Sequence, residues 1–343
     1  MFQSIRLTLL VLGIFLLSNS CSSQDPAPDS DPKQNLNPYS LGRVGSPDNA
    51  ESSTEAGLVL MGGSTDVDAA MRWMIERSGG GDFLVIRASG GDGYNDYLYD
   101  LGGLNSVETL LLNSKESANN DLVFQTIKNA EALFIAGGDQ SVYLEMWEGT
   151  LVEEAIQYLI HDKKIPIGGT SAGCAIMGEF VYSGENGSII SQEALRNPFD
   201  SRLTVRKSSL INHPFLKNTI TDQHFFQRSR EGRLVTFMAR LKSEAGEIPL
   251  KAIGVDERTA VAIDKNGIAQ VLGQSYAYFL LDNLPNLQPE KMERSAPLTW
   301  SLGGEALRYK AVNQAQNLNL DLNPWEFDWD GFWYVEEGIL KRN

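Results

Sequence analysis

The sequence is poor in cysteine and histidine, and this scarcity narrows the chemistry that it can support. It contains two cysteines, Cys21 and Cys174, and three histidines. If Cys21 is modified, Cys174 is the one remaining thiol, and no disulfide can form within the chain. No cluster of His, Cys and Asp residues has the spacing of metal ligands, so we expect no metal and no other cofactor.

Positive charge is also scarce. The chain has 29 Lys and Arg residues against 44 Asp and Glu residues, which gives a formal net charge of -15. Because nucleic acids are bound through Lys and Arg contacts to phosphates, this balance argues against a nucleic-acid partner. An acidic surface would tolerate or attract a cationic substrate, although many soluble proteins are acidic without binding one.

The N-terminal apolar run, residues 7–17, is too short to cross a bilayer, which requires about 20 residues. One arginine precedes it and small polar residues follow it, an order typical of a signal peptide. Ser18-Asn19-Ser20-Cys21 resembles a bacterial lipoprotein signal, which is cleaved before a cysteine that becomes lipidated. We therefore expect residues 1–21 to be a lipoprotein-type signal peptide and the protein to be exported and lipid-anchored in the cell envelope. Ordinary secretion and a retained anchor are the alternatives.

Three further segments follow from composition. Residues 22–55 are rich in Ser, Asp, Pro and Asn, and such a segment buries too little apolar surface to offset the entropy of ordering. We expect it to be a disordered tether. Residues 56–282 form the predicted main domain. Residues 283–343 begin with a proline-bounded linker and contain four tryptophans among alternating residues, which predicts a small β-rich extension at the C-terminus.

Short apolar runs bounded by Gly, Ser or Asn predict the strands of the main domain. Strands buried on both faces belong to parallel sheets that helices cover. Helical patterns separate the runs, and the pattern at residues 150–160 has one clear apolar stripe. This succession predicts an α/β fold with a doubly wound, mostly parallel sheet. The runs are GLVLMGG, DFLVIRAS, VETLLLN, ALFIAGG and IPIGGT.

The last run leads into GGTSAGCAIMG, residues 168–178, which places one serine among small residues. Residues 169–173 fit the G-x-S-x-G pattern of a nucleophile elbow, a strained turn that lifts a serine hydroxyl above the sheet. Ser171 would then be the nucleophile, and the N–H of Ala172 at the helix start would stabilise an oxyanion. The alternative is a tightly packed strand-to-helix corner with no catalytic role.

A serine nucleophile requires a base, and sequence position favours His224 among the three histidines. His161 lies at the polar end of a predicted helix, which indicates a surface role. His213 lies in a loop before a proline, which indicates a structural role. His224 follows an apolar run, at the kind of strand end where α/β sites gather. The alternative is a histidine that lies beneath a loop, with the hydrogen bonds of its ring satisfied and no catalytic role.

Two further motifs lie near predicted strand or helix ends. Three arginines occupy the predicted first turn of the helix after His224, where the helix dipole disfavours cations. They either bind an anionic group through two parallel hydrogen bonds or form a solvated turn.

Gly138 and Gln140 follow another strand, where a glycine N–H could complete the oxyanion hole and Gln140 could hold a substrate amide. The alternative there is a plain turn with Asp139 as the N-cap of a helix.

Three motifs in order, AGGDQ, GGTSAGCAIM and DQHFFQRSREGR, resemble the cyanophycinase-like serine peptidases and the related aspartyl dipeptidases. GVDERTAVAI resembles a further block of that family, and the resemblance spans residues 57–282. It implies a class I glutamine-amidotransferase-like, flavodoxin-like α/β fold and a Ser-His-Glu triad. It also implies cleavage of β-linked aspartyl peptides, such as the arginine-bearing polymer cyanophycin, into dipeptides of the β-Asp-Arg type.

The resemblance assigns roles residue by residue. Ser171 corresponds to the nucleophile and His224 to the base, with Ala172 and Gly138 as expected oxyanion donors. Glu193, in SQEALRNP, resembles the family's glutamate-bearing segment, and Glu185 in SGENGS is the alternative. The expected pocket or support residues are Gln140, Asp222, Gln223, Arg228, Arg230 and Arg233, and Cys174 is expected to be a small buried side chain.

Two rival functions remain open at this point. A secreted α/β-hydrolase esterase shares G-x-S-x-G, but it would place its histidine later in the chain and would commonly carry an HGGG-like segment, which is absent here. A non-catalytic surface binding lipoprotein could keep the fold, yet the retained serine, histidine and arginines argue against it. We expect a peptide or isopeptide substrate. A homodimer is possible.

Overall fold

The computed structural model describes residues 37–314, 317–322 and 324–343. The expected signal peptide with its Cys21, and residues 22–36 of the expected tether, lie outside the described residues. Among the residues described, no helix is both long and apolar enough to cross a bilayer.

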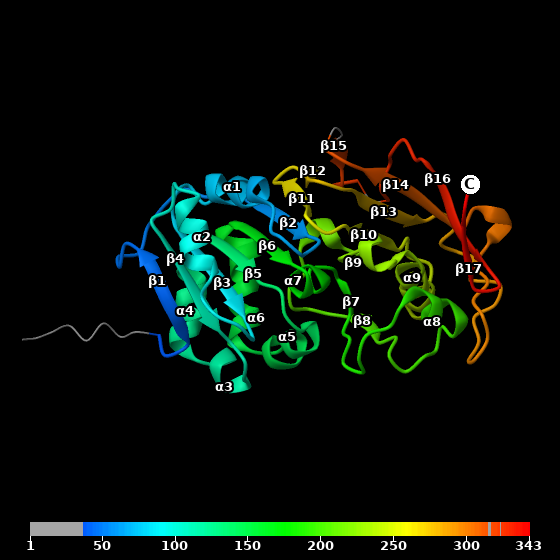
Figure 1. Ribbon diagram of the computed structural model, residues 1–343, viewed down its shortest axis with the longest axis horizontal. Coiled ribbons are helices and arrows are strands. Elements are labelled where there is room, and N and C mark those ends of the chain that lie inside the picture. Colours follow the sequence, from blue (N-terminus) through cyan, green and yellow to red (C-terminus); the bar gives the residue numbers. More distant parts are fainter. Residues whose placement is uncertain (1–36, 315–316, 323) are drawn as a thin grey trace, which may run out of the picture. The chain divides into compact units, whose positions relative to one another are not determined.

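The first sheet contains the five apolar runs as its parallel centre (Figure 1). The described strands have the order β1-β4-β3-β5-β6-β2-β11-β12-β15, in which β4, β3, β5, β6 and β2 are parallel neighbours. The flanking strands pair antiparallel. The bounds are β1 Ser40–Gly45, β2 Gly57–Met61, β3 Asp82–Arg87, β4 Ser106–Leu111, β5 Ala132–Ile135, β6 Pro166–Thr170, β11 Thr259–Asp264, β12 Ile268–Gly273 and β15 Asn317–Asn319.

Helices cover both faces of this parallel centre, which confirms the doubly wound prediction. Successive strand residues point to opposite faces, so Leu58 packs in one buried cluster with α4 and α6 while Val59 packs in another with α1 and α2. Both clusters consist of almost fully buried apolar side chains. The bounds are α1 Asp68–Arg77, α2 Tyr94–Asp100, α3 Lys115–Ala118, α4 Asp121–Asn129, α5 Gln140–Trp147 and α6 Leu151–Tyr158.

A second sheet follows in the chain, with the order β17-β16-β14-β13-β10-β9-β7-β8. Strands β7, β9 and β10 run parallel, and the others pair antiparallel. Helices α8 and α9 share a buried apolar cluster with this sheet. The bounds are β7 Phe180–Tyr182, α8 Ser191–Arg196, β8 Val205–Lys207, β9 Thr219–Asp222, α9 Glu231–Ala245, β10 Lys251–Val255, β13 Ala277–Asp282, β14 Leu307–Val312, β16 Gly331–Glu336 and β17 Ile339–Arg342.

One predicted segment boundary is corrected. The tether was expected to reach residue 55, but β1 pairs antiparallel with β4, and Arg43 forms an ion pair with Asp82. Strand β1 lies at a sheet edge with its side chains partly exposed, so it shows little apolar periodicity in the sequence. Within the expected C-terminal extension, β14 extends the second sheet beside β13 and β15 extends the first.

The two sheets bring several strand ends to one place. Strand β6 leads through Ser171 into the short helix α7 (Ala172–Ala175), and the Thr221 hydroxyl of β9 donates to the Cys174 carbonyl. Just beyond β9, the backbone N–H of His224 donates to the carbonyl of Gly62, which follows β2, at 2.8 Å. The end of β9 is thereby fastened to the end of the parallel centre, and the candidate site lies at this junction.

Candidate active site

Ser171 occupies a strained turn, as the elbow pattern predicts. Its backbone has φ 53° and ψ -116°, and a non-glycine residue adopts a positive φ only where the surroundings enforce it. The flanking glycines are required by space. A Cβ on Gly169 would lie 2.7 Å from the carbonyl carbon of Gly173, and a Cβ on Gly173 would collide with the carbonyl oxygen of Ile135. The sequence therefore builds a sharp strand-to-helix turn that projects the serine.

The serine hydroxyl lies at the end of a chain of hydrogen bonds. Ser171 Oγ is 2.9 Å from His224 Nε2, and His224 Nδ1 is 2.6 Å from Glu257 Oε1. With a neutral imidazole, Nδ1–H donates to the carboxylate and Nε2 accepts from the serine hydroxyl. This arrangement suits a serine nucleophile with a histidine base whose ring a carboxylate orients.

The surroundings keep the imidazole neutral. Burial lowers the pKa of His224, the positive charges of Arg228 and Arg230 lower it further, and the hydrogen bond to Glu257 opposes both effects. The side chain of His224 is 8 % exposed, while that of Glu257 is 25 % exposed. A neutral histidine at pH 7 can accept the serine proton, which is the state that general-base catalysis requires.

The expectation that Glu193 orients His224 is corrected by this geometry. Glu193 lies in the first turn of α8, where its Oε2 accepts from the Ile190 N–H at 3.3 Å and from Arg202 at 3.0 Å. Its carboxylate is therefore occupied in capping a helix and pairing an arginine, while Glu257 takes the position on the imidazole. The alternative, Glu185, is exposed and lines a different cavity.

The sequence did hold a signal for Glu257. It lies in GVDERTAVAI, immediately after the apolar run that forms β10. Strands β9 and β10 are parallel neighbours in which Asp222 pairs with Gly254. Residues just beyond these partners, including His224 and Glu257, must therefore emerge at the same sheet edge. Reading the run as the parallel neighbour of β9 would have identified this acid.

Seven of the residues singled out from the sequence line one cavity of about 280 Å³. The chain supplies them from the end of β5, the elbow, and the segment after β9, and the loop after β7 closes the wall. They are Gly138, Gln140, Ser171, Gln223, Arg228, Arg230 and Arg233. Of the six expected pocket or support residues, Asp222 is the one that does not line the cavity, and it is 2 % exposed.

The three arginines serve different purposes. Arg233 is 2 % exposed and binds both carboxylate oxygens of Asp222, with Nε to Oδ2 at 2.8 Å. Arg230 is buried and donates to the backbone and side-chain oxygens of Gln223, both at 2.8 Å. Arg228 is 53 % exposed at the cavity and lies 3.7 Å from Glu257. Of the three guanidinium groups, that of Arg228 is the one most open to a ligand.

The expected oxyanion donors lie next to the serine, and their role stays a prediction. Ala172 is the first residue of α7 and is buried directly after Ser171. Gly138 lines the same cavity as the hydroxyl, and a Cβ there would collide with the hydroxyl of Tyr143. The packing of Tyr143 therefore leaves no room for a side chain at position 138.

The remaining histidines and the second cysteine are placed as expected. His161 is exposed and lies 3.1 Å from the Gln157 amide oxygen. His213 is intermediate in exposure at a loop, where burial of its ring lowers its pKa to about 4. Cys174 is fully buried in α7, and burial raises the pKa of its thiol. Across the described ranges, no group of three or more His, Cys, Asp or Glu residues could hold a metal ion.

Comparison with known proteins identifies relatives of this site. The model for peptidase family S51 matches residues 94–271. A cyanophycinase from Trichormus variabilis is 27% identical over 177 residues, which cover 52% of this chain and 54% of the relative. A cyanophycinase from Synechococcus elongatus is 26% identical over 181 residues, which cover 53% of this chain and 51% of the relative.

A solved structure shares the fold. The crystal structure of a peptidase from an acI-B1 Actinobacterium superposes with a TM-score of 0.51 at 16% sequence identity, and it covers 78% of this chain and 98% of its own. At that identity the likeness concerns the fold alone. The chain spans about half the length of the curated relatives that it matches.

Proposed function

Because the chain belongs to peptidase family S51, we propose that it is a serine peptidase with Ser171 as nucleophile, His224 as base and Glu257 as the acid that orients the base. The observation that carries the proposal is the pair of hydrogen bonds that joins Ser171 Oγ to the His224 imidazole and the imidazole to Glu257 Oε1. Both the serine and the histidine have positive φ values, and such backbone strain concentrates at functional sites.

The reaction follows from these contacts. His224 Nε2 removes the proton of Ser171 as Oγ attacks the amide carbonyl carbon, which forms a tetrahedral intermediate. The N–H groups of Ala172 and Gly138 are the expected donors to its oxyanion. The imidazolium then gives its proton to the leaving amine, and the C–N bond breaks. Water, deprotonated by His224, attacks the acyl-enzyme and releases the acid with the serine restored.

The charge at the cavity favours a substrate that carries a carboxylate near the bond to be cleaved. The Arg228 side chain is half exposed beside the serine, and its nearest carboxylate, Glu257, is 3.7 Å away and already bonded to His224. A guanidinium so placed can bind an incoming carboxylate through two parallel hydrogen bonds. When a β-linked aspartyl polymer is cleaved from its C-terminal end, the last aspartyl residue presents its free α-carboxylate next to the scissile backbone amide, which fits this cation.

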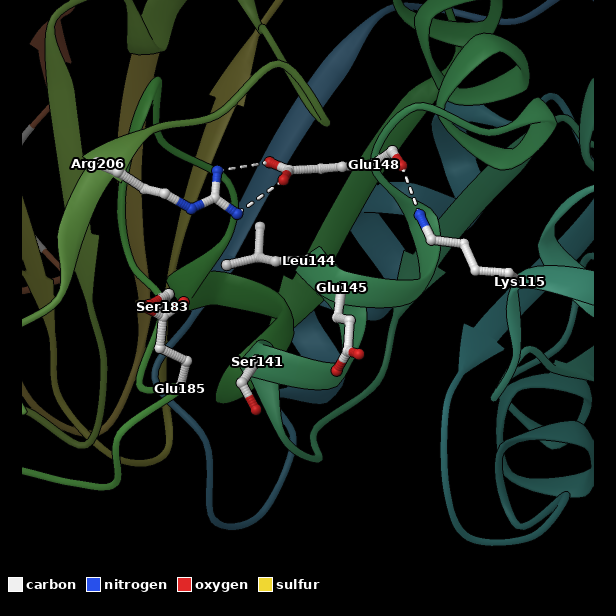
Figure 2. Close-up of a pocket in the computed structure, with 8 residues that line it drawn as sticks. All are labelled: Lys115, Ser141, Leu144, Glu145, Glu148, Ser183, Glu185 and Arg206. Atoms are coloured by element: carbon white, nitrogen blue, oxygen red, sulfur yellow. Dashed lines mark hydrogen bonds and ion pairs between the residues drawn. The ribbon is translucent and has the colours of Figure 1, made fainter.

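A second cavity, of about 520 Å³, adjoins the first along the chain (Figure 2). Ser141 lines it directly after Gln140, and Ser183 lines it between two residues that line the first cavity. Figure 2 shows Glu148 engaged at both ends, with its carboxylate on Arg206 and its backbone oxygen on Lys115. Of the two cations in this cavity, Arg206 is therefore paired with a carboxylate, whereas Lys115 donates to a backbone oxygen.

Two acids remain available in the second cavity. Glu145 and Glu185 are exposed, and within the described residues they form no ion pair. Against these two acids stands the one cation Lys115, which forms no ion pair among the described residues either, so the uncommitted charge there is net negative, opposite in sign to that of Arg228 in the first cavity. This polarity supports a substrate with a carboxylate at one end and a basic group at the other. We therefore include β-aspartyl peptides with basic side chains, the class to which cyanophycin belongs, in the proposal.

The direct test is hydrolysis of cyanophycin and of paired two-unit peptides, (β-Asp-Arg)2 and (α-Asp-Arg)2, by the protein and by Ser171→Ala. We expect cleavage between units with release of β-Asp-Arg-type products, preference for the β-linked peptide, and a loss of at least about a thousandfold in kcat for the variant, whose melting temperature should be retained. A fluorophosphonate probe separates the two parts of the proposal. Labelling of Ser171 without turnover of these peptides would overturn the substrate, whereas absence of labelling would overturn the serine peptidase.

We also propose that the protein is exported and anchored through a lipid on Cys21, on the signal described from the sequence. Metabolic labelling with a fatty-acid analogue in a bacterial host should mark the wild-type chain and leave Cys21→Ser unmarked. Release of an unlabelled wild-type chain into the medium would support ordinary secretion instead.

A further inference from the structure

The loops that carry His224 and Glu257 hold each other through one side chain from each. The first loop follows β9 and contains residues 223–230. The second follows β10 and contains residues 256–258. Each loop supplies a side-chain oxygen that accepts from a backbone N–H of the other. The exchange surrounds the His224–Glu257 hydrogen bond, although neither side chain touches the imidazole.

Asp256 makes the first half of the exchange. Its Oδ1 accepts from the N–H of Phe226, two residues after His224, at 2.9 Å. Its Oδ2 accepts from the Ser275 hydroxyl at 2.7 Å and the Tyr276 N–H at 3.3 Å. Asp256 is 1 % exposed, and within the described residues it forms no ion pair. A buried carboxylate without a cation is costly unless hydrogen bonds satisfy it, so its role here is to fix donors in place.

Gln227 makes the second half. Its amide Oε1 accepts from the backbone N–H of Glu257 at 2.9 Å. Unlike Asp256, Gln227 is exposed, so its side chain packs in no core. Because Gln227 faces solvent, we expect its hydrogen bond to the Glu257 backbone to contribute little to the free energy of unfolding. A loss of activity without a loss of stability on replacing Gln227 would therefore indicate a positioning role and not a structural one.

The backbone of His224 requires such fastening. Its φ is 45°, in the left-handed region that a residue with a Cβ rarely adopts. The His224 N–H donates to Gly62, the Phe225 N–H donates to the Val255 carbonyl at 3.2 Å, and the Phe226 N–H donates to Asp256. Three consecutive amides are thus held from outside the loop, and the third depends on one side chain.

We infer that Asp256 and Gln227 are positioning residues that keep His224 and Glu257 in register with each other. The inference deepens the proposed function and rests on it. During acylation the imidazole gains a proton, and Glu257 must stay in line with Nδ1 to stabilise that charge. Small displacements of reacting groups reduce rates strongly. Loosening either loop should therefore weaken catalysis without removing any group that contacts substrate.

The test uses the full-length chain with Gln227→Met, which keeps the side-chain size and removes the acceptor. The matched control is Gln125→Met, because Gln125 is exposed on α4 and does not line the cavity. We expect kcat of Gln227→Met to fall about tenfold, with KM and melting temperature unchanged, and the control to behave as wild type. The acid limb of the pH profile should move to lower pH, since a loosened Glu257 raises the pKa of His224 less.

A second pair of variants concerns Asp256. Asp256→Asn retains one acceptor for Phe226 and should lose less activity than Asp256→Ala, whose fold is checked by melting temperature. Gln227→Met on a Glu257→Gln background should add little further loss, because both changes act through one contact. Unchanged kcat and acid limb in Gln227→Met, or a loss fully additive with Glu257→Gln, would overturn the inference.

The readout also separates this inference from the proposed function. The rate of fluorophosphonate labelling reports the reactivity of Ser171 whatever the peptide substrate is. If the wild-type chain is not labelled, the proposed serine chemistry fails. If it is labelled and both Gln227→Met and Asp256→Asn are labelled equally fast, the chemistry stands and the positioning role fails.

Discussion

Asp222 on β9 and Gly254 on β10 are register partners in a parallel strand pair. The pairing brings the ends of the two strands to one edge of the sheet, where His224 and Glu257 form a 2.6 Å contact. Residues more than thirty positions apart in the chain thus become neighbours through one local rule of sheet geometry. The geometry of the Ser171, His224 and Glu257 triad therefore depends on the register of β9 and β10 as much as on the identity of the three side chains.

Glu257 and Glu193 provide a matched test of the triad. Glu257→Gln should reduce kcat by at least about a hundredfold, because the imidazole loses the anion that orients it and stabilises its charge. Glu193→Gln should keep nearly full activity, since its partners are the Ile190 N–H and Arg202. Steady-state kinetics of the two variants decides whether Glu257 or Glu193 orients His224. A large loss in Glu193→Gln with little loss in Glu257→Gln would restore the assignment made from the sequence.

The fold and two members of the triad, Ser171 and His224, could be predicted from the sequence because their signals are local. The parallel strands are continuous apolar runs, and Ser171 sits in a turn that only closely spaced glycines allow. Glu257 was missed because its assignment requires knowing which strand lies beside β9, a fact that periodicity does not contain. Strand β1 was missed for a related reason, since an edge strand with partly exposed side chains carries almost no apolar pattern.

The arginines show a second limit of sequence reasoning. Arg228, Arg230 and Arg233 look equivalent in the sequence, yet only contacts across the fold distinguish an arginine paired with Asp222 from one open to a ligand. The expected polar first turn is also shifted, because α9 begins at Glu231 after a 3₁₀ turn that ends at Arg228. Side-chain pairing of this kind is decided by tertiary structure.

The pH dependence follows from the surroundings of His224. Its folded-state pKa lies below the usual value of about 6.5 because burial disfavours the charged ring. We expect kcat/KM to fall as the pH drops through this lowered pKa and to reach a plateau at neutral pH. Glu257→Gln should move the limb to still lower pH, because the carboxylate is the group that raises the pKa. A limb above pH 6.5 would contradict the assignment.

The lowered pKa of His224 also makes the free energy of unfolding depend on pH. Between the lowered pKa and about 6.5, the unfolded chain binds more protons at this histidine than the folded chain does, so the free energy of unfolding rises with pH across the window. The contribution is lost as the pH falls through it. Denaturant unfolding of the wild-type chain and of His224→Gln at several pH values measures this contribution as the difference between their free energies of unfolding. A difference that grows toward acid pH would contradict the prediction.

Arg228 and Arg233 should respond in opposite ways to replacement by alanine. Arg228→Ala removes a half-exposed cation from the cavity and should raise KM for carboxylate-bearing substrates about tenfold, with little change in melting temperature. Arg233→Ala removes the closer cation from the buried carboxylate of Asp222, leaving Arg230 at 3.8 Å, and should cost about 3 kcal/mol in the free energy of unfolding. Kinetics with thermal unfolding checks both, and equal destabilisation would contradict the division of roles.

The second cavity predicts a dependence of affinity on the charge of the substrate. Glu145→Gln and Glu185→Gln should each raise KM for the two-unit peptide (β-Asp-Arg)2 about threefold, because exposed ion pairs contribute up to about 1 kcal/mol. The same variants should leave KM for a peptide with neutral side chains, such as (β-Asp-Leu)2, unchanged. Glu153 provides a control, since it carries the same charge on α6 and lines neither cavity. A rise of KM for both peptides, or an equal rise in Glu153→Gln, would show that these acids do not select the basic side chain.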